Sequence, residues 1–255
     1  MKRPIIFAHR GANTFAPENT LSAFEEAIRL GCDGIELDIR FTADREIVVF
    51  HDRNALRMTG QRLSVQKSTL RQIKSLKIVD DKGKNHSIPT LEEVLDLAGK
   101  EVLVNIDLKK ESVSRNYFEE TLLKTLRVIN LRDNIIISSF NPFSLKKLYA
   151  LNPSLHYGFI FRNRSGLMML NGHPVSSFHP RFRLLSRRFV RVLQEKGAKI
   201  YSWTVEKAEE IFKQMELGVD GIITNRPEVA LDCREKFLKN SENEADINFP
   251  KPEVL

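Results

Sequence analysis

Two histidines stand where short apolar runs of the sequence end. His9 closes the run 5–9 and is followed by Arg10, whereas His51 closes the run 47–51 and is followed by Asp52. Histidine exchanges protons close to neutral pH and is the commonest general acid or base in enzymes. One such histidine alone would more often be a structural residue, but two of them near a group of carboxylates favour a catalytic pair.

The carboxylates lie in two strand-like segments. In 34–39, Glu36 and Asp38 alternate with aliphatic residues, and in 102–109, Asn105, Asp107 and Lys109 do the same. Because the side chains of a strand point alternately to its two faces, each segment sends its polar groups to one face and its aliphatic groups to the other. A buried carboxylate is costly unless a nearby charge balances it, so this pattern needs a cationic partner.

A single divalent metal ion is the partner that this set of side chains predicts. Three oxygen ligands, with no cysteine among them, suit Mg²⁺ or Ca²⁺, with Mn²⁺ as a further alternative, better than zinc. The competing interpretation is an internal salt bridge from Lys109 or Arg10 to the carboxylates. Since one lysine cannot balance three carboxylates, the metal site is the stronger hypothesis.

Strand-like and helix-like segments alternate from one end of the chain to the other, which is typical of repeated βα units and a parallel sheet. The strand candidates span 5–9, 33–40, 47–51, 102–109, 134–139, 156–161, 175–179, 198–204 and 219–224. The run 47–51 begins about six residues after its predecessor, too soon for a parallel crossover, and is therefore expected to return as a hairpin arm. A two-residue turn at Asp44-Arg45 would place His51 opposite Asp38.

Without the hairpin arm, eight strands remain, which predicts a (β/α)8 TIM barrel rather than an open doubly wound sheet. Helices cover the outside of such a barrel, so the carboxylates of both segments are expected to point inward. Catalytic groups of these barrels lie at the carboxyl ends of the strands, which is where His9 and His51 stand. His179 and Arg181 follow the sixth barrel strand and are expected to face the same end.

One domain is expected over residues 1–240. Asn19 or Thr20 is an available cap for a helix over 20–30, and the capping-box pattern from Thr90 to Glu93 opens the helix before the third barrel strand. The segment 52–89 is too long for an ordinary loop and is interpreted as a small excursion above the barrel mouth, part helical around 70–76. Residues 241–255 are polar and proline-bearing, and a flexible C-terminal tail is expected there.

The composition indicates a reduced, cytoplasmic chain. Its two cysteines, Cys32 and Cys233, are far apart and have no metal-ligand spacing, and no segment is apolar enough for a signal peptide or a transmembrane span. A net charge of +7 favours anionic partners. Part of this charge is an arginine cluster whose alternatives are phosphate binding, transient contact with a membrane surface, RNA binding or a solvated helix face: Arg181, Arg183, Arg187, Arg188 and Arg191.

Several motifs, in matching order and spacing, resemble the glycerophosphodiester phosphodiesterase family over nearly the whole chain to about residue 238. They are His9-Arg10-Gly11, Pro17-Glu18-Asn19-Thr20, Ala23-Phe24, Glu36-Leu37-Asp38, Val49-Phe50-His51-Asp52, Asn105-Ile106-Asp107-Leu108-Lys109, Ser138-Ser139-Phe140, Trp203-Thr204-Val205 and Gly218 to Pro227. The resemblance implies a PLC-like phosphodiesterase TIM barrel that converts glycerophosphodiesters to glycerol 3-phosphate and an alcohol.

The resemblance also implies roles for individual residues. His9 and His51 would be the general acid-base pair, and Arg10 and Lys109 would bind phosphate. The metal ligands would be Glu36, Asp38 and Asp107, and the glycerol pocket would be lined by Phe140 and Trp203. In that family the glycerol 2-hydroxyl attacks phosphorus and leaves a cyclic phosphate that water opens. This chain departs from the family pattern in having Asp107 where glutamate is usual and Asn225 where aspartate is frequent.

Two other functions compete with diester hydrolysis. One is a lysophospholipase D activity at a membrane surface, with the arginine cluster docked on anionic headgroups. The other is a barrel without catalytic activity that binds phosphodiesters or anionic surfaces. Nucleic acid is a poor candidate partner, because the chain has no RNA-binding motif. The headgroup alcohol and the oligomeric state stay open at this stage.

Overall fold

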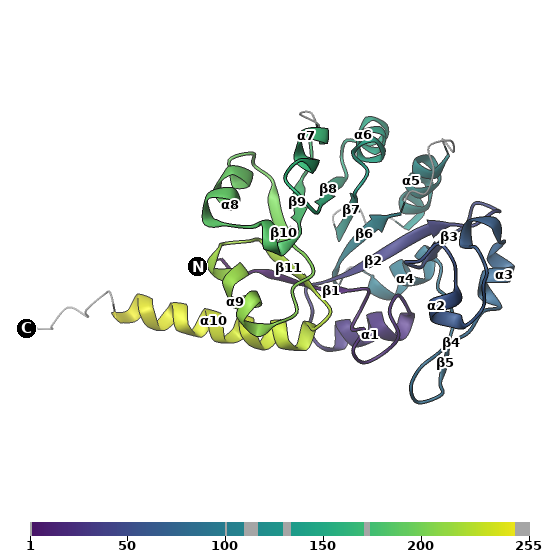
Figure 1. Cartoon of the computed structure of the whole chain (residues 1–255), viewed down its shortest axis with the longest axis horizontal. Helices are drawn as coiled ribbons and strands as arrows, with labels where there is room; N and C mark the ends of the chain where they lie inside the picture. Colours follow the sequence, from purple (N-terminus) through teal and green to yellow (C-terminus); the bar gives the residue numbers. More distant parts are fainter. Residues whose placement is uncertain (1, 100, 110–116, 130–133, 171–173, 248–255) are drawn as a thin grey trace, which may run out of the picture.

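Eight parallel strands close into a barrel in this computed structural model (Figure 1). The structure describes residues 2–99, 101–109, 117–129, 134–170 and 174–247. Around the barrel the strand order is β1-β2-β6-β7-β8-β9-β10-β11, and the pairings of β1 with both β2 and β11 close it. The strands are β1 Ile5–His9, β2 Gly34–Phe41, β6 Leu103–Leu108, β7 Ile135–Ser139, β8 His156–Phe161, β9 Ser177–Pro180, β10 Lys199–Ser202 and β11 Gly221–Thr224. The predicted TIM-barrel fold is confirmed.

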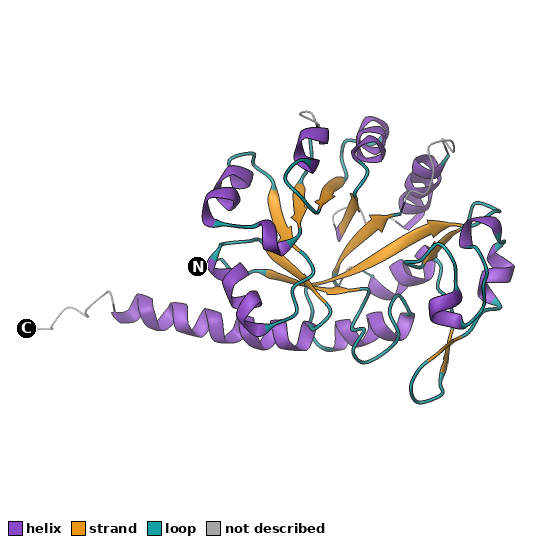
Figure 2. Ribbon diagram, in the orientation of Figure 1, coloured by secondary structure: helices purple, strands orange, loops and turns teal. Residues whose placement is uncertain are grey.

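Helices surround this barrel on its outer side, as Figure 2 shows. They are α1 Leu21–Arg29, α4 Leu91–Ala98, α5 Phe118–Ile129, α6 Pro142–Leu151, α7 Gly166–Leu170, η3 Phe182–Leu184, α8 Arg187–Gln194, α9 Ala208–Glu216 and α10 Pro227–Ile247. The expected caps are present, because Thr20 accepts from the backbone of Ala23 and Thr90 forms a capping box with Glu93. These caps satisfy helix amides that would otherwise lack partners, and so fix where α1 and α4 begin.

The apolar core has an outer and an inner part. The aliphatic residues of the strands pack outward against the helices, and β2 contributes Ile35, Leu37 and Ile39 to this layer. Inside the barrel, a smaller cluster groups Phe7 and Tyr201 with residues of β7 and β11. Because Phe7 lies two residues before His9 on the same face of β1, the apolar interior forms a floor beneath the polar groups at the carboxyl ends of the strands.

The hairpin arm β3 Ile47–Val49 pairs antiparallel with β2, as expected, but in a different register. Arg40 lies opposite Val48, and the amide of Phe50 donates to the carbonyl of Asp38. The predicted two-residue turn is therefore wrong by one position. The connection has three residues and ends at Arg45, whose φ of 71° is left-handed, the geometry of a bulged three-residue hairpin loop. His51 consequently lies one residue beyond the partner of Asp38.

The segment after the hairpin has its own small core. It contains α2 Leu56–Thr59, η1 Val65–Lys67, α3 Leu70–Lys74, β4 Ile78–Val79 and β5 Asn85–His86. Side chains of this segment, among them Ala55, Ile73 and Ile88, pack on Val48 and Phe50 of the hairpin arm. The excursion at 52–89, with its helix around 70–76, is thus present in the structure, and it covers the arm that carries His51.

The last described helix, α10, continues through residue 247, and Figure 1 shows it running beyond the barrel. The predicted domain boundary at residue 240 falls inside this helix, and 248–255 of the expected tail lie outside the described residues. Both cysteines are buried and free. Burial raises the pKa of the Cys32 thiol to about 12, as expected for a packing residue.

Candidate active site

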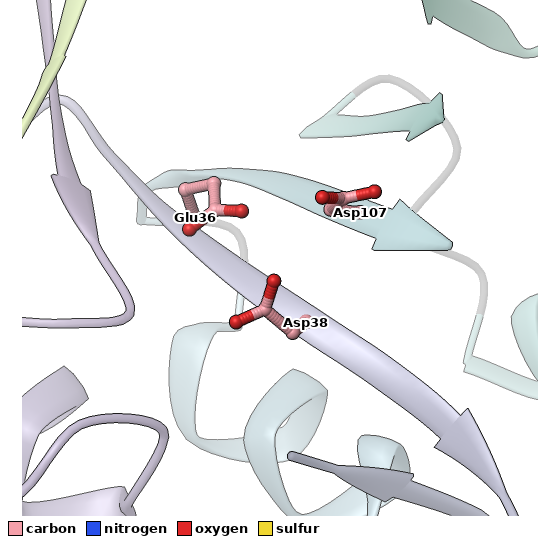
Figure 3. Close-up of side chains that lie close together, drawn as sticks. All are labelled: Glu36, Asp38 and Asp107. Carbon is pink, nitrogen blue, oxygen red and sulfur yellow. The ribbon is translucent and has the colours of Figure 1, made fainter. Parts of the chain in front are cut away.

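Three buried carboxylates meet inside the barrel (Figure 3). Glu36 and Asp38 come from β2 and Asp107 from β6, where Asp38 and Asp107 are direct neighbours across the parallel pair. One oxygen of each carboxylate lies within 4.8 Å of the others. The structure therefore brings together the three predicted ligands, on the inward face that period-two alternation predicted.

Two cations pair with these carboxylates. Lys109, which follows β6, contacts Asp107 and lies 2.9 Å from Asp38 Oδ1, and Arg10 Nε lies 3.0 Å from Asp38 Oδ2. Although burial favours the neutral acid, Lys109 and Arg10 hold the pKa of Asp38 well below its usual range. Burial, followed by the charges of Asp38 and Asp107, raises the pKa of Glu36. The internal salt bridges foreseen as an alternative are thus present, but two cations do not balance three carboxylates when all three are ionised.

The remaining acceptors fit a hard divalent cation. Asp107 Oδ1 and Asn105 Oδ1 are both buried and have no hydrogen-bond partner among the described residues. An unpartnered buried oxygen is costly, and two of them beside a carboxylate cluster that lacks positive charge would gain most from a cation with oxygen ligands. Asp107 has a shorter side chain than glutamate but still reaches the other two carboxylates.

Arg10 takes its place through an uncommon backbone conformation. Its φ of 60° is in the left-handed region, which a residue with a Cβ adopts at a cost of roughly 1 kcal/mol or more. Two hydrogen bonds hold this turn, since the Arg10 amide donates to the carbonyl of Glu36 at 2.8 Å and to its Oε2 at 3.1 Å. The side chain then reaches both Asp38 and Glu18.

His9 is held by a chain of amide groups. Asn225 Nδ2 donates to Glu206, which leaves Asn225 Oδ1 as an acceptor for Asn13 Nδ2 at 2.7 Å and for His9 Nδ1 at 2.6 Å. His9 therefore carries its proton on Nδ1, and Nε2 is the free ring nitrogen, 3.8 Å from Glu36. Burial and the nearby Arg10 charge lower the pKa of His9 to about 4, so its imidazole is neutral at pH 7.

His51 has a charged environment. Its carbonyl accepts from the Arg40 guanidinium, and its Nδ1 lies 2.7 Å from Asp52 Oδ1. Arg57 binds the other Asp52 oxygen at 2.6 Å and also reaches Glu18 at 2.6 Å. Because an ionised carboxylate only accepts hydrogen bonds, Asp52 places the Nδ1 proton of His51 toward itself and leaves Nε2 free.

Two aromatic rings form one wall of the site. Phe140 and Trp203 meet edge to face with ring centroids 5.4 Å apart, and Trp203 Nε1 donates to the carbonyl of His179 at 2.7 Å. His179 is itself buried beside Ser177, and burial lowers its pKa to about 3. Glycine is required at position 158, which contacts the His179 ring, because a Cβ there would lie 2.5 Å from His179 Nε2.

These groups enclose a cavity of about 130 Å³. Eight of the nine predicted site residues line it, and Asp38 lies fully buried beside them: His9, Arg10, Glu36, His51, Asp107, Lys109, Phe140 and Trp203. The remaining lining residues were not predicted as a site, although His179 was expected to face it: Asn105, Ile160, Arg162, His179, Thr204 and Ile223. Asn225 was noted only as a departure, yet barrel closure, which pairs Ala8 with Thr224, is a signal that places it beside His9.

Comparisons with known proteins agree with one another. Residues 9–229 match the Glycerophosphoryl diester phosphodiesterase family. A glycerophosphodiester phosphodiesterase of Caldanaerobacter subterraneus is 36% identical over 92% of this chain and 99% of its own. Another, from Bacillus altitudinis, is 32% identical over 91% of this chain and 98% of its own.

Solved structures have the same fold. A glycerophosphodiester phosphodiesterase of Thermotoga maritima superposes with a TM-score of 0.74 at 26% identity, over 92% of this chain and 99% of its own. A phosphodiesterase of Oleispira antarctica, solved with its product sn-glycerol-3-phosphate, superposes with a TM-score of 0.85 at 23% identity, over 91% and 97% of the two chains. The latter likeness supports the fold alone.

Proposed function

Because the chain belongs to the glycerophosphoryl diester phosphodiesterase family, we propose that it hydrolyses glycerophosphodiesters to glycerol 3-phosphate and an alcohol in a metal-dependent reaction. The observation that carries this proposal is the single cavity in which two histidines meet a carboxylate cluster and two cations. The family and the class of enzyme, a phosphoric diester hydrolase, agree with the interpretation of the sequence.

Glu36, Asp38 and Asp107 would hold one divalent ion, Mg²⁺ or Ca²⁺, with Mn²⁺ as an alternative. A bound ion of this kind supplies positive charge that stabilises the charge developing on phosphate. Arg10 and Lys109 lie against the same carboxylates and would bind the phosphate oxygens. Phe140 and Trp203 would line the pocket for the glycerol carbons.

The surroundings of the two histidines suggest a division of labour. His9 is neutral at pH 7 and presents Nε2 as an acceptor, which suits the base that removes the proton of the glycerol 2-hydroxyl. His51 has a carboxylate on Nδ1, which balances the charge of an imidazolium and suits the acid.

The two roles fit a reaction in two steps. The 2-hydroxyl oxygen forms a bond to phosphorus while the bond to the headgroup oxygen breaks, and that oxygen takes the proton of His51. Water then opens the cyclic phosphate to glycerol 3-phosphate: a water proton passes to His51 as the new P–O bond forms, and His9 returns its proton to the 2-oxygen as the P–O bond to that oxygen breaks. Each histidine has Nε2 as its free ring nitrogen, so the two proton transfers would be made through corresponding atoms.

Small water-soluble diesters and a cytoplasmic location fit this proposal. In the part of the chain that the structure describes, no helix is long and apolar enough to cross a membrane. Both cysteines are buried as free thiols, which agrees with a reducing compartment.

Release of glycerol 3-phosphate from a panel of glycerophosphodiesters tests the proposal. The assay compares the intact protein after EDTA treatment and after addition of Mg²⁺, Ca²⁺ or Mn²⁺, with lysolipid vesicles as a further substrate. We expect release that needs a metal and falls by at least about 10²-fold in His9→Ala. Release from lysolipid alone would favour the lysophospholipase D alternative, and release from no substrate with any metal would contradict diester hydrolysis.

A further inference from the structure

A second cavity, of about 470 Å³, opens beside the active site. We call it the basic pocket, after four cationic side chains in its lining: Arg162, Arg181, Arg183 and Lys207. The rest of the lining consists of Phe182, Trp203, Thr204, Glu206 and Glu210. The four cations face two carboxylates, so the pocket has a formal charge of +2.

The basic pocket shares a wall with the cavity of about 130 Å³ in the candidate active site, which we call the catalytic cavity. Arg162, Trp203 and Thr204 line both. The Arg162 guanidinium lies 5.1 Å from the ring centroid of Phe140 and 5.8 Å from that of Trp203, and so stands over the two aromatic rings of the active site. The two cavities are therefore neighbours, separated by Arg162, Trp203 and Thr204.

The cations of this pocket are available for a ligand. Among the described residues, none of the four forms an ion pair, whereas Glu206 accepts a hydrogen bond from Asn225 at 2.6 Å. Arg181 is also well positioned, because its amide donates to Phe161 of β8 at 3.0 Å and it bridges to Trp203 beyond β10. The pocket thus offers positive charges without an acidic partner in the described part of the chain, and the backbone of one of them, Arg181, is held by residues of β8 and of the segment after β10.

We propose that the basic pocket binds the leaving alcohol of the diester and selects alcohols that carry an anionic group, above all a second phosphate. This inference rests on the proposed function. The catalytic cavity has less than a third of the volume of the basic pocket, so the bulk of a large headgroup must lie outside it. Guanidinium groups bind phosphate oxygens in pairs of charge-assisted hydrogen bonds. A cationic headgroup such as choline would be repelled there.

A cavity between the β1–α1 loop and the excursion does not compete for this role. It is lined on one side by Asn13 to Pro17 and on the other by Arg57, Met58 and Ile78 to Lys82. It shares no lining residue with the catalytic cavity, and its two cations, Arg57 and Lys82, face two carboxylates, Asp80 and Asp81, so its formal charge is zero.

The arginine cluster of the sequence supplies both the test and its control. Arg181 and Arg183 line the basic pocket, whereas Arg187 and Arg188 lie on α8 outside it, and all four are exposed. Arg181→Gln/Arg183→Gln removes two charges from the pocket. Arg187→Gln/Arg188→Gln removes the same charge from the nearby surface, and so controls for long-range attraction of anions.

The substrates are glycerophosphoinositol, glycerophosphoinositol 4-phosphate and glycerophosphocholine, and the assay measures release of glycerol 3-phosphate. We expect the KM for the phosphorylated diester to be about tenfold below that for glycerophosphoinositol, as charge-assisted hydrogen bonds to phosphate allow. The pocket variant should lose this advantage with kcat unchanged, while the α8 variant keeps it. Equal KM values for the two inositol diesters, with turnover intact, would overturn the inference alone. Release from no diester would overturn the proposed function and this assignment together.

A binding measurement gives a readout without turnover. Trp203 is the single tryptophan of the chain and lines both cavities, so its fluorescence reports on their shared wall. Titration with inositol 4-phosphate should change its emission with saturation in the intact protein and in the α8 variant. The apparent Kd should rise by about tenfold in the pocket variant. Equal affinity in both variants would contradict the assignment of Arg181 and Arg183.

Discussion

The two histidines of the candidate active site differ in the hydrogen-bond partner of Nδ1. His9 stands at the seam of β1 and β11, where Asn225 accepts from its ring Nδ1 and Asn13 donates to its carbonyl, and only 17% of its side chain is exposed. His51 stands on a hairpin arm covered by the excursion, beside the charged pair of Asp52 and Arg57, with 34% of its side chain exposed.

This difference separates two residues that the sequence presents as equals. An amide oxygen fixes the tautomer of His9 without adding a charge, so burial keeps its imidazole neutral. A carboxylate fixes the same tautomer in His51 and also balances a positive imidazole. The surroundings, rather than the residue type, therefore distinguish the proposed base from the proposed acid.

Removing either imidazole should have the largest effect. We expect His9→Ala and His51→Ala each to lower kcat for glycerophosphocholine by about 10²- to 10⁴-fold, the usual contribution of a positioned acid or base. Steady-state release of glycerol 3-phosphate measures the loss, and circular dichroism checks the fold. A loss below about tenfold in either variant would mean that this histidine transfers no proton in the reaction.

Asn225 tests the His9 side of the comparison. Asn225→Leu removes the acceptor that holds the Nδ1 proton, and we expect kcat to fall by about 10- to 100-fold, as is common when the hydrogen-bond partner of a functional histidine is lost. Asn225→Asp keeps an acceptor and adds a negative charge that favours the imidazolium. Its kcat should largely recover at pH 8, while the acid limb of kcat/KM moves to higher pH. A profile identical to that of the intact protein would argue against contact between Asn225 and the base.

Arg57 tests the His51 side and should have a smaller effect. Arg57→Gln removes the cation that holds Asp52 and Glu18, and we expect kcat to fall by at most about tenfold because the pair is half exposed and screened. The free energy of unfolding in urea should fall by less than about 1 kcal/mol. Arg62→Gln, at an exposed position of the same excursion, is the matched control. An equal loss in both variants would assign the effect to surface charge in general.

Much of this arrangement follows from local sequence. The alternation in β2 and β6 predicts which face carries Glu36, Asp38 and Asp107, because period two is a property of any strand. Counting strands and recognising one hairpin arm gives the barrel, and the barrel places strand ends together. The carboxylate cluster therefore follows from strand alternation and the order of the elements, whereas the resemblance to the family supplied Phe140 and Trp203.

Other features depend on contacts or conformations that a local pattern does not contain. The hairpin register was missed because Arg45 adopts a left-handed conformation, which a residue other than glycine rarely takes. The partner of His9 lies 216 positions away, and a local sequence pattern carries no information on a contact over that separation. In the sequence the arginine cluster is one basic segment. In the structure the turn at η3 places Arg181 and Arg183 at the basic pocket, whereas the other three arginines lie on α8.

The most direct test of the separate roles of His9 and His51 compares two leaving groups. Glycerophosphocholine needs a proton on its departing alcohol, whereas the p-nitrophenyl diester of glycerol 3-phosphate releases a stable phenolate. We predict that His51→Ala releases choline at least about 10²-fold more slowly than the intact protein does. Its release of p-nitrophenolate should be within about tenfold of that of the intact protein. His9→Ala should be impaired equally on both. Equal impairment of His51→Ala on the two substrates, or rescue of His9→Ala by the activated ester, would contradict the assignment.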